Sequence, residues 1–132
     1  MVSSVNAIAI TTEKSFKFQI IDPMVGKWFL SSTNGTGTQD ASKALICTLN
    51  NSVMKCGGKG FPDFSGDMVL LATADAESES EGWSIDSNNN IDWNAMENMK
   101  FSVIGDDNEM WAEVCPHEHL DGHHGEAKAI YV

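Results

Sequence analysis

The apolar residues of this chain recur at every second position in short runs, and each run ends in a cluster of Gly, Asn, Asp or Ser. A period of two is typical of strands that bury one face of a sheet. No window of about 11 residues sustains the helical spacing i, i+3, i+4 and i+7. The sequence therefore predicts an all-β, antiparallel protein of ten to twelve short strands.

Two segments predict hairpins with a defined register. A turn at residues 87–89 would place two tryptophans and two isoleucines on one face of the first hairpin, and a turn at 105–108 would close the second. The facing residues are Trp83 with Trp93 and Ile85 with Ile91 in the first hairpin, and Phe101 and Val103 with Met110 and Ala112 in the second.

A third hairpin carries two of the three cysteines. A turn at Asn51 and Ser52 would place Cys47 opposite Cys56. Opposed Cα atoms of antiparallel strands lie about 4.5–5.5 Å apart, a distance that a disulfide tolerates. Two small thiols packed side by side in a core would fit the same pattern. The disulfide and the reduced pair both remain open from the sequence.

The compartment also remains open. The N-terminus lacks the basic and apolar regions of a signal peptide, so we expect either a cytoplasmic protein or a mature secreted chain. Two triplets, at residues 34–36 and 50–52, match the N-glycosylation motif, which has a meaning only in a secretory pathway.

The charge balance excludes several partners. Eight lysines and no arginine stand against 19 acidic residues, which gives a net charge of −11. Nucleic acids and acidic lipid surfaces bind basic patches, so we expect neither as a partner. No apolar run approaches the roughly 20 residues that cross a bilayer, so we expect no membrane insertion. The length of 132 residues predicts a single domain, 1–132.

Three similar runs begin at residues 26, 66 and 108, about 41 residues apart. Each follows a Phe-bearing segment and precedes a polar loop, and these loops lie at 32–42, 73–81 and 115–125. In this periodicity, and in its size, acidity and Asn and Gly content, the chain resembles small fungal β-trefoil lectins and protease inhibitors. The resemblance implies a β-trefoil of three four-stranded units. It carries over no sugar-binding residue, because the Gln-x-Trp signature of ricin-type lectins is absent. A closed β-barrel or a sandwich, lipocalin-like in type, is the alternative.

All four histidines lie within residues 115–126. His117 and His119 would point the same way on an extended segment, and His123 or His124 could complete a site. Imidazoles at this density suit Zn²⁺, Cu²⁺ or Ni²⁺. A transition-metal-binding protein or metalloenzyme is therefore one hypothesis for the function, and a solvated, pH-sensitive loop is the other interpretation of this segment.

The leading hypothesis is a non-enzymatic binding protein that presents polar loops on a rigid β scaffold to a glycan or a protein partner. Its candidate ligand-binding residues are Trp111, Asn34 in the first polar loop and Asp121 in the last. Trp111 is included because alternation places it with Glu109 and Glu113, on the face opposite the apolar one. Protease inhibition by one exposed loop is a further alternative.

Overall fold

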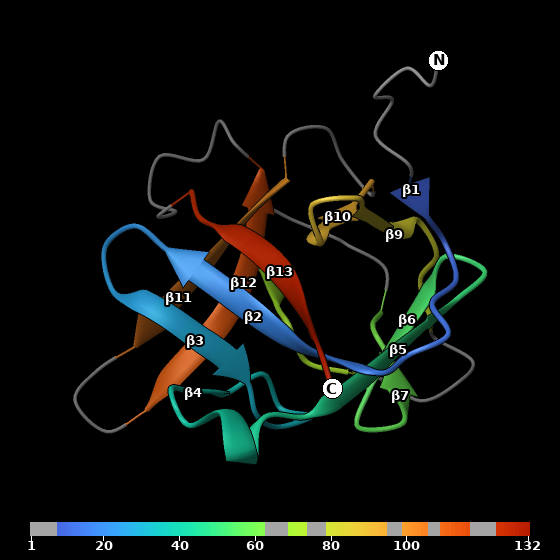
Figure 1. Ribbon diagram of the computed structural model, residues 1–132. Coiled ribbons are helices and arrows are strands. Elements are labelled where there is room, and N and C mark those ends of the chain that lie inside the picture. Colours follow the sequence, from blue (N-terminus) through green and yellow to red (C-terminus); the bar gives the residue numbers. More distant parts are fainter. Residues whose placement is uncertain (1–7, 63–68, 74–78, 95–98, 106–108, 117–123) are drawn as a thin grey trace.

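The computed structural model describes residues 8–62, 69–73, 79–94, 99–105, 109–116 and 124–132. In these residues short antiparallel strands are joined by turns and by one 3₁₀ helix, so the all-β prediction is confirmed (Figure 1). The elements are β1 (Ile8–Ala9), β2 (Phe16–Asp22), β3 (Gly26–Leu30), β4 (Gly37–Thr38), η1 (Ala41–Lys43), β5 (Ile46–Asn50), β6 (Val53–Cys56), β7 (Lys59–Gly60), β8 (Val69–Leu70), β9 (Trp83–Asp86), β10 (Asn90–Trp93), β11 (Met99–Gly105), β12 (Met110–Pro116) and β13 (Glu126–Tyr131).

The strands form a large sheet of ten and a small sheet of three. The large sheet runs in the order β1-β9-β10-β13-β2-β5-β6-β7, with β3 paired to β2 and β4 to β3, and the small sheet is β11-β12-β8. Within the part of the chain that the structure describes, β1 and β7 do not pair, so the ladder of the large sheet stays open. The closed β-barrel is therefore wrong for these residues, and the β-trefoil, which also needs a closed ring of strands, is not supported.

The polar loop that follows the first of the three similar runs is hydrogen-bonded to the other two runs. The Ala112 N–H donates to the Gly35 carbonyl at 2.8 Å, and the Leu71 N–H donates to the Ala112 carbonyl at 2.9 Å. The Thr73 N–H donates to the Thr33 carbonyl at 2.9 Å. The polar loop after β3 is thereby tied to the small sheet.

Aromatic side chains join the two sheets over one core. Phe18 of the large sheet lies edge-on to Phe101 of the small sheet, with ring centroids 5.7 Å apart. Trp83 stacks on Trp93 at 4.6 Å, and both are buried. The predicted pairs Trp83–Trp93 and Ile85–Ile91 are confirmed. Every second residue of β2 and of β9 is buried, and this alternation places Phe18 and Trp83 on the inner face of the large sheet.

The second predicted hairpin forms, but its register is shifted by two residues from the expected one. The expected turn at 105–108 would set Val103 opposite Met110 and Phe101 opposite Ala112, whereas in the structure Val103 faces Ala112. Phe101 faces Val114, and Met110 faces Gly105. The pairing therefore extends further along β12 than the sequence suggested, and it reaches Met99 and Pro116 at the far end.

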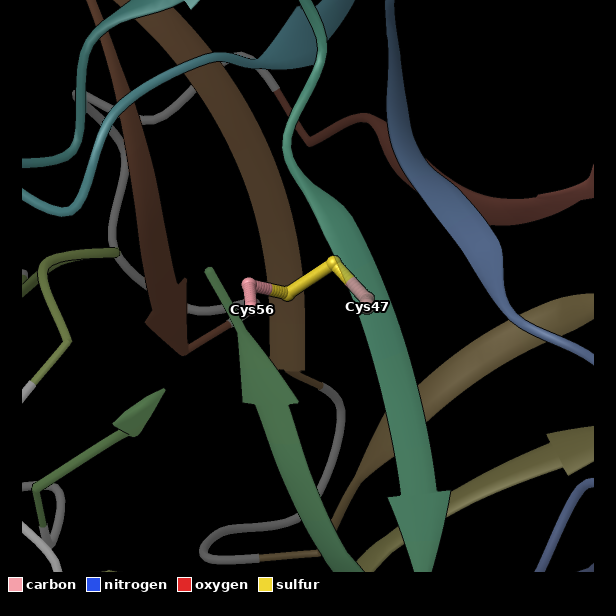
Figure 2. The surroundings of a disulfide bond; sticks show 2 residues. All are labelled: Cys47 and Cys56. Carbon is pink, nitrogen blue, oxygen red and sulfur yellow. A yellow bond between two sulfur atoms is a disulfide. The ribbon is translucent and has the colours of Figure 1, made fainter. Parts of the chain in front are cut away.

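A disulfide closes the β5–β6 hairpin. Cys47 and Cys56 are opposed in the ladder and covalently linked, with Cα atoms 4.1 Å apart (Figure 2). Asn51 and Ser52 have φ values of 51° and 66°, which is the pattern of a type I′ turn and of its right-handed twist. Of the two interpretations left open by the sequence, the structure contains the disulfide, and both sulfur atoms lie in the core.

A buried carboxylate also ties the sheets together. Asp22, at the end of β2, is 2% exposed. Its Oδ2 accepts a hydrogen bond from the Val103 N–H at 2.8 Å, across the boundary between the sheets. Its Oδ1 accepts from the N–H groups of Met24 and Val25 in the turn that leads to β3. One side chain therefore fixes both a turn and the position of β11.

Candidate functional site

A shallow groove of about 500 Å³ lies on the outer face of the small sheet. We call it the Trp111 groove. Its lining residues are Leu70 of β8, Ile104 and Gly105 of β11, and Trp111 and Glu113 of β12. Ile104 faces Trp111 in the ladder, and Leu70 faces Glu113. Because directly opposed residues share a face, these side chains form one surface.

Alternation along β12 explains why an indole lies here. Ala112 and Val114 are buried against the core, whereas Trp111 and Glu113, which alternate with them along the strand, are only partly buried. The neighbouring Leu70 is 40% exposed. The groove thus combines a tryptophan, two aliphatic side chains and one carboxylate on three paired strands, where backbone hydrogen bonds hold their positions.

The first polar loop forms one rim of this groove. Thr36 is bridged to Trp111 as an antiparallel partner, and so lies on the same face. The Thr36 hydroxyl donates to Ser32 Oγ at 2.6 Å, and the same Ser32 oxygen accepts from the Asn34 N–H at 3.2 Å. Asn34 itself is exposed, and it precedes Gly35, whose carbonyl is bonded to β12. The structure therefore brings the loop of Asn34 beside Trp111.

Cys115 lies further along the same face of β12, where it is a buried free thiol. Burial raises the pKa of this thiol, although a hydrogen bond with Ser102 acts in the opposite direction. A raised pKa keeps the thiol protonated, and a protonated thiol is a weak nucleophile and a weak metal ligand. Nothing about Cys115 therefore resembles an activated catalytic cysteine.

An acidic cavity of about 260 Å³ lies on the large sheet, where Asp86, Asp92 and Glu126 are among its lining residues. Burial alone would raise the pKa of Asp86, but hydrogen bonds from Asn90 and Asn88 outweigh it and hold this pKa below its usual value. The Asp86 carboxylate therefore accepts hydrogen bonds from the β9–β10 turn, which it stabilises.

The histidine cluster lies mostly outside the described residues, which exclude His117, His119, His123 and Asp121. His124 is described, is partly buried and has a φ of 55°. Among the residues that the structure describes, no three His, Cys, Asp or Glu side chains gather as a metal site. Binding of Zn²⁺, Cu²⁺ or Ni²⁺ by this segment stays a prediction.

Sequence reasoning missed Leu70 and Ile104 as walls of the groove. Each belongs to an apolar run that is typical of a buried strand, and only the register against β12 shows that both side chains lie beside Trp111. Alternation within β11 is the one signal that could have separated Ile104 from the buried Phe101 and Val103.

A comparison of the chain with protein-family models, with curated proteins and with solved structures found no match in any of the three. In the described part of the chain, no helix has the length and apolar character needed to span a bilayer.

Proposed function

We propose that this chain is a non-enzymatic, lectin-like binding protein that holds a glycan in the Trp111 groove. The observation that carries the proposal is the partly exposed indole of Trp111 beside Ile104 and Leu70 on the outer face of the small sheet. A pyranose ring has an apolar face of C–H bonds, which suits an aromatic ring, and hydroxyl groups at its edge, which need polar partners. Glu113 and the hydroxyl-rich rim at residues 31–36 supply polar groups next to the indole.

The charge of the protein narrows the class of glycan. A net charge of −11 repels sulfated, phosphorylated and acidic sugars, whereas it attracts amino sugars. The Glu113 carboxylate accepts hydrogen bonds from hydroxyl or ammonium groups. We therefore expect neutral oligosaccharides or oligosaccharides of amino sugars as ligands.

A glycan array followed by titration calorimetry on the bound glycans tests this proposal. Trp111→Ala removes the stacking surface, so we expect its Kd to rise at least roughly 30-fold, which corresponds to the loss of about 2 kcal/mol at a binding hot spot. Trp111→Phe keeps an aromatic ring and should lose less. Ile130→Ala, at an exposed position on β13 of the large sheet, is the matched control and should bind as the wild type does.

Equal affinity of Trp111→Ala and the wild type for every bound glycan would rule out the groove as the site. Absence of binding across neutral and amino-sugar glycans would rule out the proposal as a whole. Protease inhibition and recognition of a protein partner stay predictions from the sequence.

A further inference from the structure

The turn of the β5–β6 hairpin carries a modification motif. Asn50-Asn51-Ser52 has the Asn-x-Ser/Thr spacing of an N-glycosylation acceptor. The same hairpin is closed by the Cys47–Cys56 disulfide, a bond that oxidising compartments form and maintain. Two independent features of one hairpin thus fit passage through a secretory pathway. We propose that Asn50 is a site of N-linked glycosylation.

The local geometry exposes the acceptor side chain. Residues of β5 alternate between exposed and buried positions, with Cys47 and Leu49 in the core and Asn50 outside. Asn50 is the last residue of the strand, and the type I′ turn at Asn51 and Ser52 reverses the chain directly after it. A glycan on this amide therefore extends from the tip of the hairpin without displacing any core side chain.

A polar groove of about 480 Å³ adjoins the amide and gives the first sugar space and hydrogen-bonding partners. Lys55 and Glu79 meet in it as an ion pair at 3.2 Å. Its lining residues are Thr48, Asn50, Asn51, Val53, Lys55, Glu79 and Glu81. Carboxylate, amide, ammonium and hydroxyl groups are the partners that the hydroxyls and the acetamido group of N-acetylglucosamine require.

Asn34, in the second motif of the chain, provides an internal comparison. It is exposed as well, but its loop forms the rim of the Trp111 groove, where an attached glycan would lie over the proposed ligand site. Asn50 belongs to the large sheet, so its modification leaves that groove accessible. The inference for Asn50 does not depend on the proposed function.

The transfer is a substitution at a sugar carbon. Nδ2 of Asn50 attacks C1 of the N-acetylglucosamine at the end of a lipid-diphosphate-linked oligosaccharide. The Nδ2–C1 bond forms as the bond from C1 to the phosphate oxygen breaks, and the lipid diphosphate leaves with the electron pair. The amide nitrogen gives up one proton to a base of the oligosaccharyl transferase, and no oxidant or reductant takes part.

The test directs the full chain into the secretory pathway of a eukaryotic host and compares intact masses before and after peptide N-glycosidase treatment. In the wild type we expect an added oligosaccharide mass, whose enzymatic removal converts Asn50 to aspartate. Asn50→Gln and Ser52→Gly each break the motif and should lose this glycan. Both variants preserve the hairpin, because position 50 is exposed and glycine suits the φ of 66° at position 52.

Asn34→Gln is the matched control, since it changes an equally exposed amide and should retain the glycan on Asn50. A secreted protein with an intact disulfide and an unmodified Asn50 would overturn the proposal. So would an unchanged oligosaccharide mass in both Asn50→Gln and Ser52→Gly.

Discussion

Asp22 accepts three backbone N–H groups with one buried carboxylate, so its removal leaves several donors without a partner. We expect Asp22→Ala to lower the free energy of unfolding by about 2–4 kcal/mol. The buried N–H groups would lose their charged acceptor without regaining hydrogen bonds to water, and this desolvation destabilises the folded state. Asp22→Asn keeps one acceptor oxygen and should lose less. Urea denaturation of both variants measures the difference. Wild-type stability in Asp22→Ala would contradict the role assigned to this carboxylate.

At the level of single residues, the sequence predicts the apolar core better than the polar contacts. Alternation alone identified Trp83 and Trp93 as core residues, because a residue's own strand decides which face it occupies. Asp22 precedes Pro23 in a segment that reads as an exposed turn, and its partner Val103 lies 81 residues away. A contact of that kind depends on how two sheets pack, which local patterns do not encode.

The β5–β6 hairpin is an element held by a covalent bond. Reduction of Cys47–Cys56 releases a loop closed over a sequence separation of 9, and we expect it to lower the free energy of unfolding by roughly 2–3 kcal/mol. Denaturation with and without dithiothreitol measures this loss. Cys115→Ala is the control, since this variant keeps the disulfide and should show the same difference on reduction. A midpoint that does not respond to reduction would show that the bond adds no stability.

The registers of the β5–β6 and β9–β10 hairpins could be predicted from the sequence, because each depends on a short turn and its immediate neighbours, whereas the β11–β12 register differs from the predicted one. The pairs Cys47–Cys56 and Ile85–Ile91 follow from the turns at 51–52 and 87–89. The walls of the Trp111 groove could not be predicted in this way, since Leu70 reaches β12 from a separate part of the chain. The spacing of about 41 residues, on which the expected β-trefoil rested, does not determine whether the first and last strands pair. For this reason it could not show that the large sheet stays open within the described residues, where the alternative closed barrel is wrong.

The charge of −11 acts on the whole molecule. Like charges on a compact surface repel one another, and salt of roughly 1 M shortens the screening length to about 3 Å. We expect added sodium chloride to raise the melting temperature at neutral pH. The rise should be much smaller near the isoelectric pH of about 4.5, where the net charge is close to zero. Calorimetric scans at the two pH values measure both effects, and equal responses would contradict a repulsive origin.

A sheet that does not close has backbone N–H and C=O groups without strand partners at its edges, and another chain can pair with such an edge. Within the described residues the terminal strands of the branched large sheet, β1, β4 and β7, are each two residues long, as is β8 at one margin of the small sheet. Along β11 at the opposite margin, Asp22 accepts from Val103 and Gly125 bridges Phe101. In the described part of the chain each of these margins thus offers few free groups in a row, which disfavours aggregation through edge-to-edge strand addition although the ladder does not close there.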